Sequence, residues 1–275
     1  MKKLSIMMAL IVMVITGHSQ SFEGTIKWTM KMEITDPKVK AQMEEAKKKM
    51  NDPATQAQMK EMLAKMNDPQ MKAMMDANPQ MKTQMEAAMK MMAGGDMNSM
   101  FPTGMAIQIK GENSLTKMEG GIMDKSEILY HGDKNLSTKI DHAVKTYTPM
   151  NTYTDKPETA SKTTPKVTKT SETKKILNYT CTKYIVESTD SKSKVTRQIF
   201  WTTKQIDIDM KKLAQHHVRD NQFFYENIDG VPLRTEMIMP EGNMTMEVTD
   251  VKKESLSSSI FQIPAGYKEV KGIGF

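Results

Sequence analysis

The stretch SFEGTIKWTMKMEI, residues 21–34, places an apolar or small residue at every second position. Phe22, Ile26, Trp28, Met30 and Met32 alternate with glutamate, threonine and lysine side chains. Successive side chains of a strand point to opposite faces of a sheet, so a period of two predicts one buried face and one wet face. We therefore expect the folded part of the chain to begin with a strand over residues 20–35.

The residues before this strand have the parts of a signal peptide. Two lysines precede an apolar run over residues 4–15, and Gly17 and Ser19 offer small residues for cleavage before Gln20. The run is shorter than the ~20 apolar residues that a membrane-spanning helix needs. Residues 1–19 are therefore predicted to direct export and to be removed.

Charge and cysteine content narrow the possible partners. The formal net charge is +6, and loss of Lys2 and Lys3 with the signal peptide leaves +4. A net positive charge this small does not indicate an anionic partner, and we expect no nucleic-acid binding. Cys181 is the single cysteine, which excludes an internal disulfide framework and makes a buried small side chain the simplest interpretation.

The sequence offers no catalytic motif, and we predict that the protein is not an enzyme. No zinc-protease helix motif, nucleophile elbow or glycine-rich phosphate loop is present. The adjacent His216 and His217 would point about 100° apart on a helix, so they could not share a ligand.

Between residues 36 and 95 the apolar period changes to that of a helix. Four dipeptides each set an N-cap residue before a proline suited to the first helical position: Asp36-Pro37, Asp52-Pro53, Asp68-Pro69 and Asn78-Pro79. Methionines then recur on one helical face, at Met43, Met50, Met59, Met62, Met66, Met81, Met85 and Met89. Residues 36–95 are predicted to form an inserted methionine-rich helical segment.

Three interpretations of this methionine segment remain open. Residues 30–105 hold eighteen methionines and neither histidine nor cysteine. Thioethers suit Cu(I) or Ag(I), so Met59, Met62 and Met66 form an alternative soft-metal site. Methionine also builds pliable apolar binding surfaces, and it can simply replace leucine in a helix. The spacing follows the helix period, which favours the pliable surface, with no bound cofactor.

Short strand-like segments fill most of the remaining chain. They lie in residues 96–150 and 176–275, separated by turn signals, with a short helix expected at 209–220. Residues 151–175 are rich in threonine and lysine and offer little to bury, so they are predicted to be an exposed, flexible connection. The expected fold is α+β, a curved antiparallel sheet or incomplete β-barrel with the helical segment inserted after its first strand.

Several segments resemble one family of exported Gram-negative bacterial proteins that is catalogued only as a domain of unknown function. They include KKILNYTCTKYIV (174–186), IFWTTKQI (199–206), GVPLRTEMIM (230–239), TMEVTDV (245–251) and SIFQIPAGYKEV (259–270). The family is similar to LolA/LolB-like carriers, whose incomplete barrels hold lipoprotein acyl chains or lipids. The methionine segment also resembles the Asp-Pro and Asn-Pro helices of co-chaperones that hold apolar client segments.

The resemblance implies a non-enzymatic carrier in the periplasm, or alternatively a secreted one. Its ligand would be a lipid, an acyl chain or an apolar peptide, with the methionine helices as a lid or appendage and peripheral membrane contact possible. An envelope structural or interaction protein is a further alternative. From strand alternation we expect the ligand to contact Trp28, Met30, Ile107, Trp201, Met237 and Phe261.

Overall fold

A computed structural model describes residues 21–66, 68, 101–121, 124, 126–150, 165–189, 195–209 and 227–270. These residues form α1 (Pro37–Asn51), α2 (Pro53–Met66), the 3₁₀ turn η2 (Ser258–Phe261) and one sheet. The strands of the sheet are β1 (Gly24–Ile34), β2 (Gly104–Lys110), β3 (Asn113–Glu119), β4 (Ser126–His131), β5 (Leu136–Asp141), β6 (Thr146–Met150), β7 (Lys166–Ile176), β8 (Tyr179–Thr189), β9 (Val195–Thr203), β10 (Val231–Ile238), β11 (Gly242–Lys253) and β12 (Lys268–Glu269).

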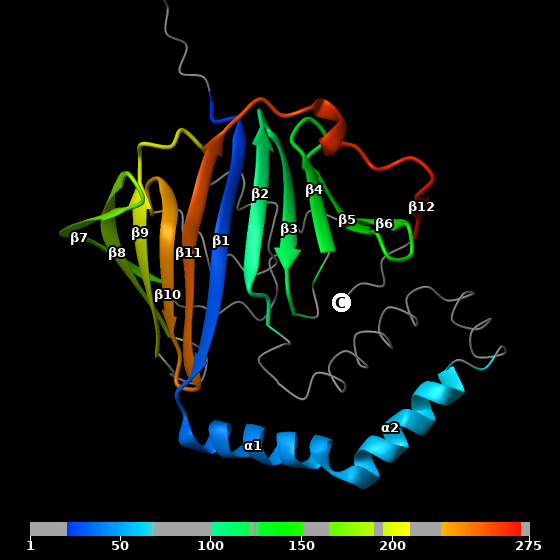
Figure 1. Cartoon of the computed structure of the whole chain (residues 1–275). Helices are drawn as coiled ribbons and strands as arrows, with labels where there is room; N and C mark the ends of the chain where they lie inside the picture. The colour runs from blue at the N-terminus through cyan, green and yellow to red at the C-terminus, as the bar shows by residue number, and fades with distance from the viewer. Residues whose placement is uncertain are drawn as a thin grey trace, which may run out of the picture.

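The first strand of the chain lies in the middle of the sheet (Figure 1). The strand order is β12-β6-β5-β4-β3-β2-β1-β11-β10-β9-β8-β7. β1 pairs with β2 on one side and with β11 on the other, so it joins the two halves of the sheet. Among the described strands the short β12 pairs in parallel with β6, and the other pairs are antiparallel.

The alternation predicted for β1 is confirmed by its burial. Ile26 and Trp28 are buried, whereas the residues that follow each of them, Lys27 and Thr29, are exposed. Toward β11 the register shifts between Lys27 and Trp28, which marks a β-bulge. A bulge increases local twist and bends a strand, so it contributes to the curvature of the sheet at its centre.

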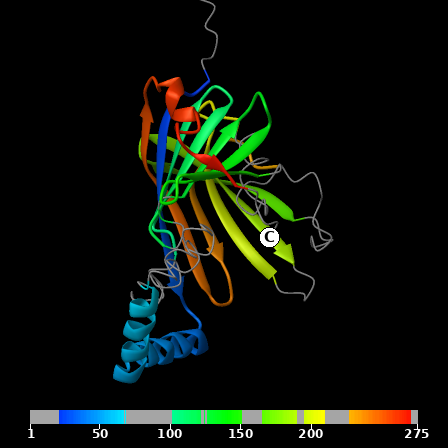
Figure 2. The same cartoon turned by 90° about the vertical axis from the view of Figure 1, so that its right-hand side faces the viewer.

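The sheet is open and strongly curved, as the sequence predicts. Figure 2 shows that the strands at both ends, β4–β6 and β7–β9, bend toward the same side and away from β1 and β11. We call the inner side of this bend the concave face and the outer side the convex face. Residues paired across antiparallel strands share a face, so the register assigns each side chain of β1–β6 to one of them.

On the concave face, at the end of β1 where the chain enters, the core consists of branched and aromatic side chains. Ile26 lies opposite Ile107 of β2 and Val251 of β11. These residues belong to a cluster of buried side chains that includes Phe22, Ile26, Trp28, Ile107, Ile109, Leu233 and Val248. Their burial supplies the main apolar stabilisation of this half of the sheet.

On the convex face, the C-terminal segment packs over β3–β5. Leu115, Leu129 and Ile140 form a buried cluster with Leu256 and Phe261. Figures 1 and 2 show η2 on the outer side of the sheet, beside the ends of β3 and β4. The chain then reaches β6 and adds β12 to that edge of the sheet.

α1 begins and ends as its sequence predicts. The carboxylate of Asp36 accepts hydrogen bonds from the backbone N–H groups of Lys38 and Val39, and Pro37 is the first helical residue. No residue of α1 is fully buried, and the predicted stripe, which includes Met43 and Met50, is half-covered.

The rest of the methionine segment is described in part. Met59, Met62 and Met66 lie in α2, where the structure describes their backbone only. Met81, Met85 and Met89, like the helix expected at 209–220 and the signal peptide, lie outside the described residues. Among the described helices, none has the length and apolar content to span a membrane.

Two predictions of local structure are wrong. Residues 166–175, expected to belong to the flexible connection 151–175, form most of the edge strand β7, which pairs with β8. An edge strand with exposed faces needs few apolar residues, and threonine favours extended backbone. The segment 259–261, expected to be a strand, lies in η2, where the Ser257 side chain caps the turn.

The central position of β1 yields a stability prediction. Ile26→Ala should lower the free energy of unfolding by about 2–5 kcal/mol, because it leaves a cavity between three paired strands. The neighbouring Lys27→Ala points to the wet face and should change it by no more than about 0.5 kcal/mol. Urea unfolding measures both, and equal effects of the two substitutions would contradict the assignment of faces.

Candidate functional site

The side-chain type on the concave face changes to methionine toward the end of the sheet that joins α1. Along β1, Ile26 and Trp28 are followed by Met30 and Met32 on the same face. Met30 lies opposite Met246 of β11, and Met32 lies opposite Met244. The change thus occurs at the same level of two neighbouring strands.

The same change extends to the strands on either side. Met237 of β10 lies opposite Met244, whereas Met105 of β2 lies opposite both Trp28 of β1 and Met118 of β3. We call these seven side chains the methionine belt: Met30, Met32, Met105, Met118, Met237, Met244 and Met246. The belt crosses β3, β2, β1, β11 and β10, which are consecutive in the sheet.

The belt is less covered than the core beside it. Met237 and Met246 are 5% and 8% exposed, while the other five are half-buried. Met30, Met105 and Met244 pack against the cluster that contains Trp28. The belt therefore continues the apolar core toward α1 as a surface that is partly open in the described structure.

The convex face of these strands is polar at the same level. Arg234 of β10 lies opposite Glu247 of β11 and forms ion pairs with Glu247 and with Glu236, at 2.7 Å for the latter. Thr29 of β1 completes this row of residues. The contrast between the faces shows that the apolar surface at this end of the sheet is one-sided.

Four of the six residues expected to contact a ligand lie on the concave face. Trp28 and Ile107 are buried in its core, Met30 packs against them, and Met237 lies in the belt. Their role in ligand binding stays a prediction.

The other two expected contact residues are placed differently, and for Phe261 the expectation of a shared face was wrong. Trp201 lies opposite Arg234 of the polar convex row, with the Lys174 ammonium 4.4 Å from its ring, and it also packs against the buried cluster that contains Trp28 and Ile107. Phe261 packs on Leu115 of the convex face. Alternation within one strand cannot relate the faces of strands distant in the sequence, so it could not place these two residues.

Sequence reasoning missed most of the belt because it attended to helical methionines. The signal was present as the pairs Met30-Lys31-Met32 and Met244-Thr245-Met246, each spaced by two. What the sequence did not supply was the antiparallel register that sets one pair against the other.

Among the described residues of the concave face, two polar groups are buried and have no hydrogen-bond partner in the described structure. Gln198 of β9, 2% exposed, lies opposite Met237, and its Oε1 is unpaired. Thr116 of β3 lies opposite Ile107, and its Oγ1 is likewise unpaired. Such groups cost free energy when buried alone, so they mark positions where a ligand can supply a donor.

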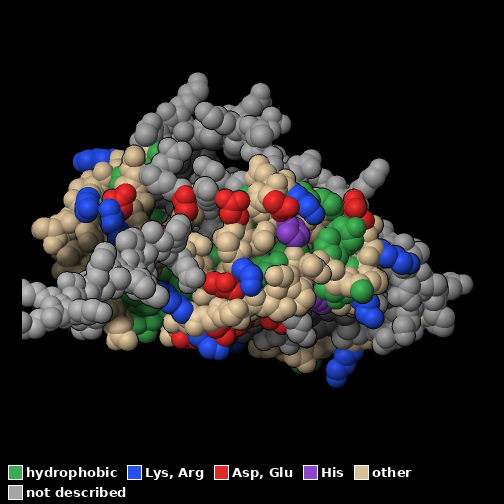
Figure 3. All heavy atoms as spheres, turned by 90° about the horizontal axis from the view of Figure 1, so that it is seen from above, with side chains coloured by type: hydrophobic (Ala, Val, Ile, Leu, Met, Phe, Trp, Pro, Cys, Tyr) green, Lys and Arg blue, Asp and Glu red, His purple; other side chains and the backbone are tan. Residues whose placement is uncertain are grey.

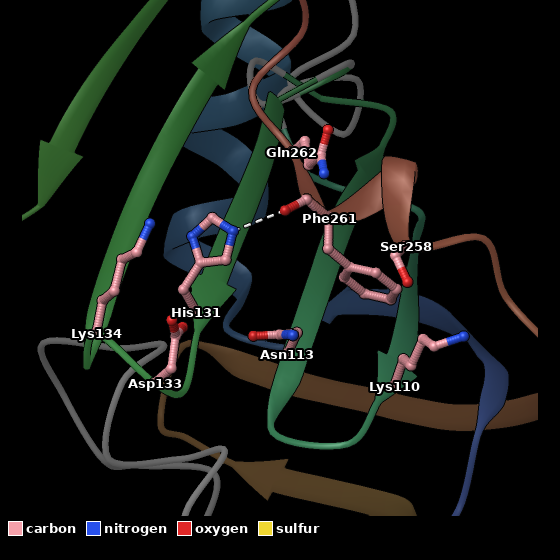
Figure 4. A pocket seen from close by; sticks show the side chains of 8 residues that line it. All are labelled: Lys110, Asn113, His131, Asp133, Lys134, Ser258, Phe261 and Gln262. Carbon is pink, nitrogen blue, oxygen red and sulfur yellow. Dashed lines mark hydrogen bonds between the residues drawn. The ribbon is translucent and has the colours of Figure 1, made fainter.

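A separate pocket lies on the convex face beside η2 (Figure 4). It is lined by Lys110, Asn113, His131, Asp133, Lys134, Ser258, Phe261 and Gln262. Nε2 of His131 lies 2.7 Å from the Phe261 carbonyl oxygen, and the Lys110 ammonium lies 3.0 Å from Glu23 Oε1. Because these polar groups already bind the C-terminal segment and its neighbours, we interpret the pocket as part of that attachment.

A second group of ionisable side chains attaches the same segment. Nδ1 of His142 lies 2.7 Å from the Tyr267 hydroxyl, and Nε2 lies 2.8 Å from Glu127 Oε2. The second contact is not aligned as a hydrogen bond, so it acts as an ion pair when His142 is protonated. Lys117 forms a further ion pair with Glu127 at 2.8 Å.

No other described group suggests catalysis. Cys181 is fully buried, as expected, and this burial raises the pKa of its thiol, which disfavours the nucleophilic thiolate. In the described part of the chain, no three His, Cys, Asp or Glu residues come together to hold a metal ion. Figure 3 shows acidic and basic side chains interspersed at the end of the sheet away from α1.

Comparison with protein families shows to which family the chain belongs. The family described as "Domain of unknown function (DUF4412)" matches residues 97–267. The chain belongs to this family. The expected family is thereby confirmed, and the DUF4412 match includes every strand except β1 and β12. The comparison with curated proteins finds no match.

Solved structures give weaker similarities. PNGF-II shows 17% identity at a TM-score of 0.35 over 62% of this chain, which spans 28% of that protein. A putative outer membrane lipoprotein-sorting protein domain from Vibrio parahaemolyticus shows 12% identity and a TM-score of 0.26, over 57% of this chain and 80% of that one. A LolA superfamily protein from Nitrosomonas europaea shows 12% identity and a TM-score of 0.25, over 58% and 80%. Similarities this low assign neither a ligand nor an activity to this DUF4412 protein.

The Glu127 group yields a prediction for acid conditions. Burial alone would raise the pKa of Glu127, but Lys117 and His142 outweigh it and lower that pKa below its ordinary value. The unfolded chain therefore binds this proton more readily, so the stabilisation is present at neutral pH and is lost as the pH falls through the carboxyl range.

Glu127→Gln should accordingly lower the free energy of unfolding at pH 7 by about 1–2 kcal/mol, a value limited by the exposure of Lys117. The difference in unfolding free energy between the variant and the unmodified protein should shrink as the pH falls to about 3.5, because this pH lies below the ordinary glutamate pKa of about 4.3. Urea unfolding at both pH values tests this, with the exposed Glu44→Gln of α1 as control. A difference that does not change with pH would contradict it.

Proposed function

We propose that this protein is a non-enzymatic carrier that binds an apolar ligand on the concave face of its sheet. The observation that carries the proposal is the methionine belt, an apolar and half-buried surface on one side of five adjacent strands. An acyl chain or another extended apolar group is the ligand class that such a long, one-sided surface fits.

The use of methionine supports a ligand of variable shape. Branched residues fill the well-buried half of the concave face, where a fixed packing is needed. Methionine has an unbranched and flexible side chain, which adapts to irregular partners. The change from Ile26 and Trp28 to Met30 and Met32 therefore separates a fixed core from an adaptable binding surface.

The unpaired oxygen of Gln198 adds a polar point to this surface. It lies beside Met237, at the β9 border of the belt. A ligand with a hydroxyl or amide donor at one position would satisfy it without losing apolar contact elsewhere.

The predicted signal peptide supports export, and α1 follows β1 at the end of the sheet where the belt lies. α1 starts three residues after β1 ends, and its half-covered stripe carries Met43 and Met50. A half-covered apolar stripe is suited to contact a ligand, or the apolar segment of a partner protein.

Binding of a fluorescent fatty-acid analogue tests the proposal with two adjacent substitutions. Met30→Lys puts a charge on the concave surface and should weaken binding by at least about tenfold, since burying an unpaired charge is costly. Thr29→Lys puts the same charge on the convex face, opposite Glu247, and should leave binding unchanged. Fluorescence titration measures the dissociation constants, and circular dichroism checks that both variants fold.

Loss of binding in both variants would place the ligand elsewhere. A protein that binds no acyl probe, and that carries no lipid in native mass spectrometry after purification from its own envelope, would overturn the carrier proposal.

A further inference from the structure

We infer that the centre of the methionine belt is a binding site for a soft monovalent metal ion, Cu(I) or Ag(I), formed by Met30, Met32, Met244 and Met246. The two Met-x-Met pairs lie on adjacent antiparallel strands in direct register, Met30 opposite Met246 and Met32 opposite Met244. The inference does not rest on the proposed carrier function, although the site lies on the same surface, and the site is distinct from the helical methionines of α2.

The register brings four thioether side chains close together. Side chains opposite each other in a strand pair have Cβ atoms about 4.5–5.5 Å apart, and positions two apart along a strand are about 6.6–6.8 Å apart. A methionine side chain is long and freely rotating, so three or four sulfurs from this small rectangle can turn toward one ion. Met237, opposite Met244, offers a further thioether beside them.

The chemistry of the surroundings selects the metal. Thioether sulfur is a soft ligand that suits Cu(I) and Ag(I) and gives little affinity for Ca²⁺ or Mg²⁺. The charged side chains of the same strand, Lys31 and Glu33, alternate with the methionines and so point to the convex face. On the concave face Trp28 precedes Met30 along β1 and Thr235 of β10 lies opposite Met246, and neither side chain carries a charge.

Packing alone does not explain methionine at these positions. The same strands use isoleucine, valine and tryptophan in their buried half, and such β-branched and aromatic residues favour the extended backbone. Methionine at four facing positions gives up this preference and supplies sulfur instead. Met30, Met32 and Met244 are half-buried and can be reached from outside, whereas Met246 is buried beside them.

Titration with Ag(I), which needs no reductant, tests the inference against a competing chelator. The full chain should bind Ag(I) tightly, and the fourfold variant Met30→Leu, Met32→Leu, Met244→Leu and Met246→Leu should bind it at least 10–100-fold more weakly. Zn²⁺ and Ca²⁺ should not compete. The triple variant Met59→Leu, Met62→Leu and Met66→Leu in α2 is the matched control and should retain full affinity.

Two further measurements separate the possible outcomes. Methionine methyl resonances, assigned in ¹³C-methyl-labelled protein, should shift for the four belt residues at one equivalent of Ag(I). Circular dichroism should show an unchanged sheet in the fourfold leucine variant, because leucine keeps the surface apolar. If the fourfold variant misfolds, the double variant Met32→Leu and Met244→Leu, which removes one facing pair, gives the same test.

Retention of Ag(I) affinity by the belt variants, or its loss in the α2 control, would overturn the site in the sheet. An absence of tight binding in the unmodified chain would overturn it as well.

Discussion

The structure depends on the hydrogen bonding of β1 to strands on both sides. Its backbone pairs with β2 over residues 24–29 and with β11 over residues 24–34, so it is hydrogen-bonded to both halves of the sheet. Without this strand, β2–β6 and β7–β11 would be two separate sheets, each with an additional open edge. The helical insertion between β1 and β2 is compatible with their pairing because the long connection leaves from the end of β1 and returns to β2 at the same end of the sheet.

The same strand also divides the concave face into two zones of different physical character. Where Ile26 and Trp28 lie, branched and aromatic side chains pack against one another in a buried cluster. Where Met30 and Met32 lie, the side chains are flexible and half-buried. One face of a single sheet thus combines the rigidity that maintains its curvature with an adaptable surface, and the sulfur atoms of that surface bring a ligand chemistry that hydrocarbon side chains lack.

Much of the fold could be predicted from local patterns, because alternation and turn residues are local properties. The strand at residues 20–35, most later strands and the start of α1 were predicted in this way. β7 was missed because an edge strand buries little, so its threonines and lysines gave no hydrophobic signal. The partners of Trp201 and Phe261, and the facing arrangement of the two Met-x-Met pairs, depend on contacts between residues far apart in the chain. Such register follows from the assembled sheet, and no period in the sequence specifies it.

An open sheet, unlike a closed barrel, keeps two edges whose unpaired backbone groups can recruit a strand from another molecule. At one edge this chain places β7, with Lys166, Lys169 and Lys175 exposed and an irregular register between Lys169 and Thr173. At the other edge β12 extends for two residues only and pairs in parallel. Charge and irregularity at the first edge, and shortness at the second, are features that oppose edge-to-edge polymerisation. The lysine-rich β7 carries too few apolar residues to look like a strand in the sequence. For the same reason, it is suited to keep neighbouring copies from extending the sheet into fibres.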